Sequence, residues 1–232
     1  MTLRLPFGPR VALLLVALVA LVATFPMRLA LDALDLDARG LTAREVRGPV
    51  WGAQLAQVKV RDVMIGEVRA GLSPWSLLVG TARIRLTDGP LTGSVYTGLR
   101  SFGVEGLNGA LPSVAAMPPL PASALTLENV TIGFRDGVCD RAEGTARLAV
   151  APVAGIGIGE MRATARCDGE AALLPFQADS GVATAEMRVL AAGRYSLTLT
   201  MMGADAQLTN ALTAAGFRTS PTGLSMTVEG SL

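Results

Sequence analysis

Apolar and polar residues alternate along most of the chain after residue 40. In the first half the alternating segments are residues 41–46, 54–60, 67–72 and 81–86. In the last of these, Ile84 and Leu86 lie on one face and Arg85 lies on the other. A period of two with one polar face is typical of half-buried antiparallel strands. The pattern therefore predicts a mainly β fold, with about ten or more strands by this count.

The alternation returns in the second half, which begins after a proline-rich stretch. Its predicted strands are residues 124–134, 141–150, 159–167, 171–177, 183–190, 194–202 and 224–232. A slip in phase near Asn129 predicts a β-bulge, and Asp136-Gly137 predicts a turn. Residues 205–215 instead place Leu208 and Leu212 on one helical face, and Gly216 ends the pattern. The second half is thus also β-rich, with one short helix.

One short helix also interrupts the strands of the first half, at residues 73–78. Ser73 is a suitable N-cap, and Pro74 fits the first helical position because its missing N–H has no helical acceptor there. Gly80 is suited to close the helix in the left-handed conformation. We expect Trp75 and the two leucines that follow to pack into the sheet, which makes Pro74 and Trp75 a structural plug rather than a ligand-binding pair.

The start of the chain is apolar and uncharged over residues 11–27, between Arg10 and Arg28. Seventeen such residues are close to the minimum for a helix that crosses about 30 Å of hydrocarbon. Because the cationic end stays in the cytoplasm, the rest of the chain is expected on the far side of the membrane. A cleaved signal peptide is the alternative, with Ala20 or Ala23 at the cleavage site. Under both interpretations, the rest of the protein is exported.

These features divide the chain into six parts. They are a cytoplasmic N-terminus (1–10), a transmembrane anchor (11–27), a juxtamembrane connector (28–40), a first β subdomain (41–110), a proline-rich connection (111–121) and a second β subdomain (122–232). Four prolines in the connection, which reads LPSVAAMPPLP, argue against helix or central strand there. The connection is either a linker between the two halves or a long crossing within one continuous sheet.

Composition argues against several classes of function. The net charge is +1 without long runs of one sign, which argues against a nucleic-acid-binding surface. The chain contains no histidine, so Ser-His-Asp and Cys-His catalysis are excluded and a zinc site is not expected. Candidate acid–base carboxylates are Asp136, Asp140, Asp168 and Asp179, but all four lie in turn-like contexts where Asp is common for backbone reasons. We expect no enzyme activity, no cofactor and no metal.

The two cysteines, Cys139 and Cys167, lie in the exported part. An oxidising compartment favours a disulfide between them. The closed loop of about 29 residues would stabilise the fold by roughly 3–4 kcal/mol in the chain-entropy model. The alternative is a pair of buried free thiols.

Several stretches resemble the N component of the bacterial type II secretion system. Residues 46–53 read VRGPVWGA, residues 72–80 read LSPWSLLVG, and residues 167–169 read CDG. The cysteine pair and the closing run through Leu208, Leu212, residues 215–217 and Gly223 follow in the family's order. The resemblance covers most of the chain, and the Cys-Asp-Gly stretch is its most specific part.

This resemblance implies a single-pass inner-membrane protein whose periplasmic β-rich domain is an accessory part of the secretion apparatus. Expected partners are other secretion components, namely inner-membrane subunits and the outer-membrane secretin. The first half is also similar to AsmA-like periplasmic proteins, which implies the alternative of a lipid-binding module with a hydrophobic groove. Half of the residues are apolar, which favours that alternative. The sheet is therefore expected either as a sandwich or as a curved, half-open sheet.

Overall fold

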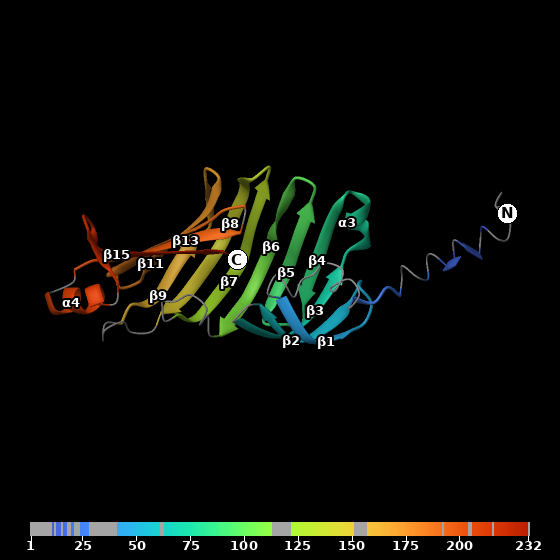
Figure 1. Cartoon of the computed structure of the whole chain (residues 1–232), viewed down its shortest axis with the longest axis horizontal. Helices are drawn as coiled ribbons and strands as arrows, with labels where there is room; N and C mark the ends of the chain where they lie inside the picture. Colours follow the sequence, from blue (N-terminus) through green and yellow to red (C-terminus); the bar gives the residue numbers. More distant parts are fainter. Residues whose placement is uncertain are drawn as a thin grey trace.

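The computed structural model describes the body of the chain as antiparallel β-sheet (Figure 1). The described residues are 41–60, 63–112, 122–150, 157–191, 193–203, 206–214 and 216–231, together with 24–27 and single positions between 11 and 20. The structure confirms the predicted mainly β class with few helices.

The described strands fall on the two sides of the proline-rich connection. Before it lie β1 (Leu41–Arg47), β2 (Ala53–Val60), β3 (Val63–Leu72), β4 (Thr81–Thr87), β5 (Leu91–Gly98) and β6 (Ser101–Pro112). After it lie β7 (Ala122–Arg135), β8 (Val138–Val150), β9 (Gly159–Thr164), β10 (Arg166–Asp168), β11 (Ala171–Ala178), β12 (Ala183–Val189), β13 (Arg194–Met201), β14 (Arg218–Ser220) and β15 (Gly223–Ser231). Helix α3 (Pro74–Leu78) joins β3 to β4, and helix α4 (Ala206–Ala214) lies between β13 and β14.

All of these strands belong to one sheet. Its order is β1-β2-β3-β4-β5-β6-β7-β8-β9-β11-β12-β13-β15-β14, and β10 pairs with β11 off this path. Most neighbours in the sheet are also neighbours in the chain, so short hairpins build most of its width. The predicted bulge near Asn129 is confirmed by a register shift between Glu128 and Thr131. Strands β5, β6 and β14 were not predicted.

The two faces of the sheet differ in polarity. Residues directly opposite each other on neighbouring strands share a face. One such row crosses β4 to β8 and consists of Ile84, Val95, Val104, Ile132 and Ala142, which we call the apolar row. The adjacent positions Arg85, Ser94 and Glu105 form a polar row on the other face.

The largest buried cluster lies towards the C-terminal side of the sheet. It contains residues of β8, β9, β11, β12, β13, α4 and β15, among them the fully buried Met161 and Leu212. Figure 1 shows strands β13 and β15 running across β8 and β9 rather than extending their plane. The sheet thus curls over at this end, whereas the clusters at its β1–β4 end are small.

Strand β6 enters the predicted proline-rich connection by two residues, Leu111 and Pro112, so the expectation of no strand was wrong there; β7 begins directly after the connection. The two strands pair from Ser101 opposite Arg135 to Pro112 opposite Ala124, with two shifts of register. The ladder therefore continues across the expected boundary between residues 41–110 and 122–232. Residues 113–121 lie outside the described residues, and the division into two subdomains stays a prediction.

The predicted transmembrane anchor falls only partly within the described residues. Its flanks Arg10 and Arg28, the N-terminus (1–10) and the connector (28–40) lie outside them. No helix in the described part of the chain is long and apolar enough to cross a bilayer. The end of the segment is held against the sheet, because Val50 N donates to Phe25 O at 2.9 Å and Met27 N donates to Gly48 O at 3.2 Å.

Candidate interaction surface

Each carboxylate considered for acid–base chemistry has its own arginine partner. The pairs are Asp136 with Arg100, Asp140 with Arg135, Asp168 with Arg188, and Asp179 with Arg162. All four carboxylates are about half exposed. Among the described residues, no group of three or more His, Cys, Asp or Glu side chains is placed to hold a metal ion. The arrangement is that of surface ion pairs.

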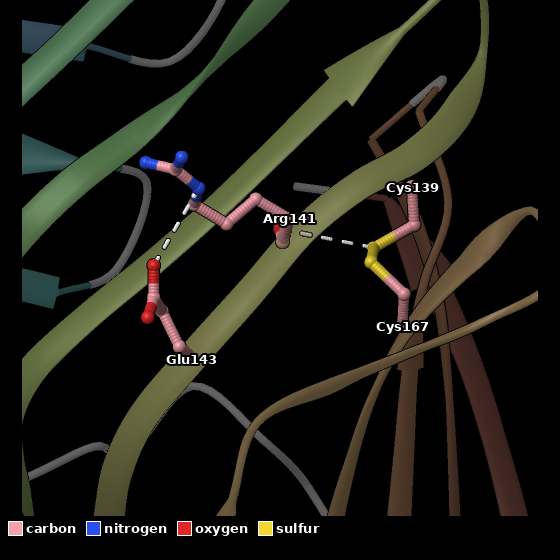
Figure 2. Close-up of a disulfide and its surroundings, with 4 residues drawn as sticks. All are labelled: Cys139, Arg141, Glu143 and Cys167. Carbon is pink, nitrogen blue, oxygen red and sulfur yellow. Dashed lines mark hydrogen bonds and ion pairs between the residues drawn. A yellow bond between two sulfur atoms is a disulfide. The ribbon is translucent and has the colours of Figure 1, made fainter.

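The disulfide between Cys139 and Cys167 joins β8 to the short strand β10, as predicted (Figure 2). Cys139 is buried beside Phe134, Ala172 and Val189. Figure 2 shows the Arg141 side chain leaving the same strand away from the disulfide, where its Nε lies 3.5 Å from Glu143 Oε1. The disulfide therefore lies on the packed side of β8, and the ion pair between Arg141 and Glu143 lies away from it.

The polar face of the sheet carries cross-strand ion pairs. Arg83 pairs with Glu105 and Arg147 pairs with Glu128. The hydrogen bond to Glu160 and the nearby charge of Asp179 raise the pKa of Arg162 above its ordinary value. These charges are paired within the chain, so this face presents a solvated surface.

The two ends of the sheet path differ in length. β14, at one end, has three residues. β1, at the other end, has seven, and none of the described residues pairs with its outer side. An edge strand presents unpaired N–H and C=O groups to which a strand of another chain can bond. β1 is therefore the longer open edge.

Charged side chains surround this open edge. Glu45 and Arg47 of β1 are exposed and form an ion pair. Beside them lies an open hollow of about 330 Å³, lined in part by Glu67 and Arg69 of β3 and by Asp88. Arg69 Nη1 lies 2.7 Å from Asp88 Oδ2. We call β1 and this hollow the edge surface; its exposed side chains carry charges of both signs.

Helix α3 does not pack as predicted. Trp75 is 77% exposed, and no residue of the helix is buried. The prediction that Trp75 and Pro74 plug the sheet was therefore wrong. Ser73 does precede the helix, but its hydroxyl makes no capping bond; instead Ser76 Oγ donates to Ser73 O at 2.7 Å. The helix therefore lies between β3 and β4 with its apolar side chains exposed.

The sequence indicated the disulfide but neither the edge surface nor the exposure of α3. Local alternation shows that residues 41–46 form a strand, whereas its place at the edge depends on long-range pairing. The alternating charges of Glu45 and Arg47 are the one local sign, since charged residues are common on exposed edges.

A family model matches most of the chain. The family model described as type II secretion system (T2SS), protein N, matches residues 39–227. No curated protein and no solved structure matches the chain significantly. The matched range covers the whole described sheet except the end of β15, together with the disulfide and helices α3 and α4.

Proposed function

The chain belongs to the type II secretion system protein N family, and from this premise we propose that it is a non-catalytic accessory component that docks other secretion subunits through its edge surface. The observation that carries the proposal is the open, seven-residue strand β1 beside a charged hollow. The pairing of every candidate carboxylate with an arginine supports a binding role over a hydrolytic one.

The proposed location is the bacterial inner membrane, with the sheet in the periplasm. Two observations support it. The segment at residues 11–27 is uncharged between Arg10 and Arg28. The disulfide between Cys139 and Cys167 suits an oxidising compartment. The anchor thus keeps the edge surface close to the inner-membrane subunits, which are its first candidate partners; the outer-membrane secretin is the second.

The proposed mode of binding is strand addition. A partner strand would bond to the outer N–H and C=O groups of β1, and its side chains would contact Glu45, Arg47 and the hollow. Main-chain hydrogen bonds provide affinity in this mode, and the flanking side chains provide specificity.

A proline scan of β1 tests this mode. Along an antiparallel edge strand, alternate N–H groups point to the neighbouring strand and outward. The effect of proline at Ala43, Arg44, Glu45 and Val46 is therefore expected to depend on whether the N–H group that it removes points outward or to the neighbouring strand. At outward positions the free energy of unfolding changes little, because edge strands tolerate proline there, while secretion of a cargo protein falls sharply.

Serine at Ala43 and alanine at Arg44 and Val46 are the matched controls, because these residues keep the backbone N–H and leave the Glu45 side chain of the edge surface in place. They are expected to leave secretion largely unchanged. Normal secretion with proline at every outward position would contradict strand addition at β1.

A lipid-binding role is the second candidate. The observation that favours it is the apolar row, which is only partly covered: Val95 is 40% exposed, and Ile84, Val104 and Ile132 are half-buried. A half-exposed apolar sheet face is a suitable surface for acyl chains. Phospholipid bound along this row, with no protein partner at β1, would favour this function.

A further inference from the structure

The most exposed large apolar side chains gather at one place on the sheet. Trp75, Leu78 and Val79 are exposed by 77%, 78% and 77%, and Leu99 by 98%. Among the described residues, no other large apolar side chain is more than 70% exposed. We call these four residues the tip patch. Contiguous exposed apolar patches usually mark a site of contact with a protein or a membrane.

The four residues lie in two neighbouring connections, from β3 to β4 and from β5 to β6. Thr81, at the start of β4, pairs with Gly98, at the end of β5. A Cβ built on Gly98 would lie 3.6 Å from Gly80 O, so the turn that carries Leu99 adjoins the end of α3. The patch therefore combines two adjacent connections at one end of the sheet. No charged residue occurs between positions 73 and 80.

A second group of exposed apolar side chains belongs to the N-terminal segment. Leu13, Leu14 and Val16 are exposed by 69%, 68% and 68%. Every large apolar side chain exposed by more than two-thirds in the described part of the chain thus falls in one of these two groups. In water, neither group of side chains has an apolar environment.

The two groups are attached to the same end of the sheet. Residues 25–27 bond to Gly48 and Val50, and Leu72 N donates to Val50 O at 2.9 Å. Met27, Val50 and Leu72 also pack in one cluster. Three residues then lead from Leu72 to Trp75, a reach of at most about 11 Å. Figure 1 shows α3 at the same end of the sheet as β1, β2 and β3.

We propose that the tip patch inserts into the interface of the same phospholipid bilayer that the N-terminal segment enters. The inference rests on the membrane anchoring put forward under Proposed function. A bilayer is the occupant that fits both groups, because the anchor holds the end of the sheet at the membrane surface. Tryptophan favours the headgroup region, and apolar side chains of interfacial segments sit about 5–10 Å deep at the headgroup–acyl boundary.

Tryptophan fluorescence of the full-length chain tests the proposal. The chain contains two tryptophans, so Trp51→Phe leaves Trp75 as the reporter. The protein is reconstituted into vesicles of phosphatidylethanolamine and phosphatidylglycerol that contain phosphatidylcholine brominated on its acyl chains. We expect brominated lipid to quench Trp75 strongly and aqueous acrylamide to quench it weakly.

Two variants in the Trp51→Phe background separate patch from anchor. Leu78→Glu is expected to shift Trp75 emission to longer wavelength and to remove most of the quenching by brominated lipid. Met202→Glu makes a similar change at an exposed apolar residue just after β13, far from α3 in the order of strands, and is expected to leave the quenching unchanged. Because both residues are exposed, neither variant should impair folding.

Flotation of the vesicles distinguishes the two possible failures. If the chain does not float with vesicles, the proposed membrane anchoring fails and the tip-patch proposal fails with it. If the chain floats but Trp75 is quenched by acrylamide and not by brominated lipid, the tip-patch proposal alone is overturned. That second result would leave a protein partner as the occupant of the patch.

Discussion

Replacing both cysteines with alanine is expected to lower the free energy of unfolding by about 3–4 kcal/mol. The disulfide joins residues 28 positions apart, and its loss restores the loop-closure entropy of the unfolded chain. The bond also links strands on either side of a part of the sheet where few residues pair. β9 pairs with β11 only through Gln177 with Arg162 and Ala178 with Met161, whereas most other neighbours pair over six or more positions.

The crosslink is placed where the strand order changes. After β9 the chain continues as β10, which pairs with β11 and not with β8. Cys167 in β10 is tied to Cys139 in β8, so the disulfide holds together two strands that no ladder connects directly. We therefore expect the C-terminal curl of the sheet to loosen first when the bond is absent.

Chemical denaturation of the full-length chain in detergent provides the measurement. Dithiothreitol should reduce the stability of the unmodified protein to that of the Cys139→Ala/Cys167→Ala variant and should have no effect on the variant itself. A loss below about 1 kcal/mol, well under the typical range for a native disulfide, would show that the pairing contributes little.

Alanine at Gly103 is expected to destabilise the protein by about 3 kcal/mol, at the upper end of overpacking effects. Gly103 in β6 lies between two neighbours, opposite Gly133 in β7 and opposite Tyr96 in β5. A Cβ at Gly103 would lie 2.3 Å from Ile132 O, a backbone atom in the ladder. The strands must separate to accept it, which weakens their hydrogen bonds.

Gly133 provides an informative comparison. A Cβ there would lie 2.5 Å from Tyr96 Oη, and the next atom, Tyr96 Cζ, would lie at 3.8 Å. Gly133→Ala is therefore expected to cost about 1–2 kcal/mol, and Tyr96→Phe should relieve most of this cost by removing the phenol oxygen. Tyr96→Phe should not rescue Gly103→Ala, because the obstruction there is backbone.

The control for these substitutions is Gly157→Ala, since a Cβ at Gly157 meets nothing within 4 Å. Thermal or urea unfolding of the variants in parallel provides the free energies. Equal effects of alanine at Gly103 and Gly157 would contradict the close approach of β6 and β7. Equal rescue of both clashing variants by Tyr96→Phe would contradict the assignment of the obstructing atoms.

Local sequence pattern predicted the strands whose faces differ in polarity. The segment at residues 81–86 corresponds to β4 (Thr81–Thr87), and the helix at residues 205–215 corresponds to α4 (Ala206–Ala214). In both, tertiary packing favours the same face that the pattern marks as apolar. The family resemblance was confirmed as well, because the family model matches residues 39–227, which contain the stretches at residues 46–53, 72–80 and 167–169.

Other features could not be read from local pattern. Strands β5 and β6 contain Gly93, Gly98, Gly103, Gly106 and Gly109, and each glycine interrupts the alternation. Their pairing depends on close backbone approach, which becomes visible only when the partner strand is known. Trp75 was misplaced for a related reason: the local sequence marks where α3 begins, but whether the helix is covered depends on the tertiary arrangement, which leaves it exposed. The free edge at β1 likewise follows from the order of the whole sheet.

The most direct test of the docking proposal is photo-crosslinking in living, secretion-competent cells. A photoreactive amino acid is placed at Glu45 or Arg47 in the edge surface, at Val95 in the apolar row, and at the exposed Glu186 of β12 as a control. We predict adducts with other type II secretion components from Glu45 and Arg47 and none from Glu186. Secretion that proceeds without any protein adduct at β1, together with phospholipid adducts at Val95, would contradict the docking role and favour lipid binding.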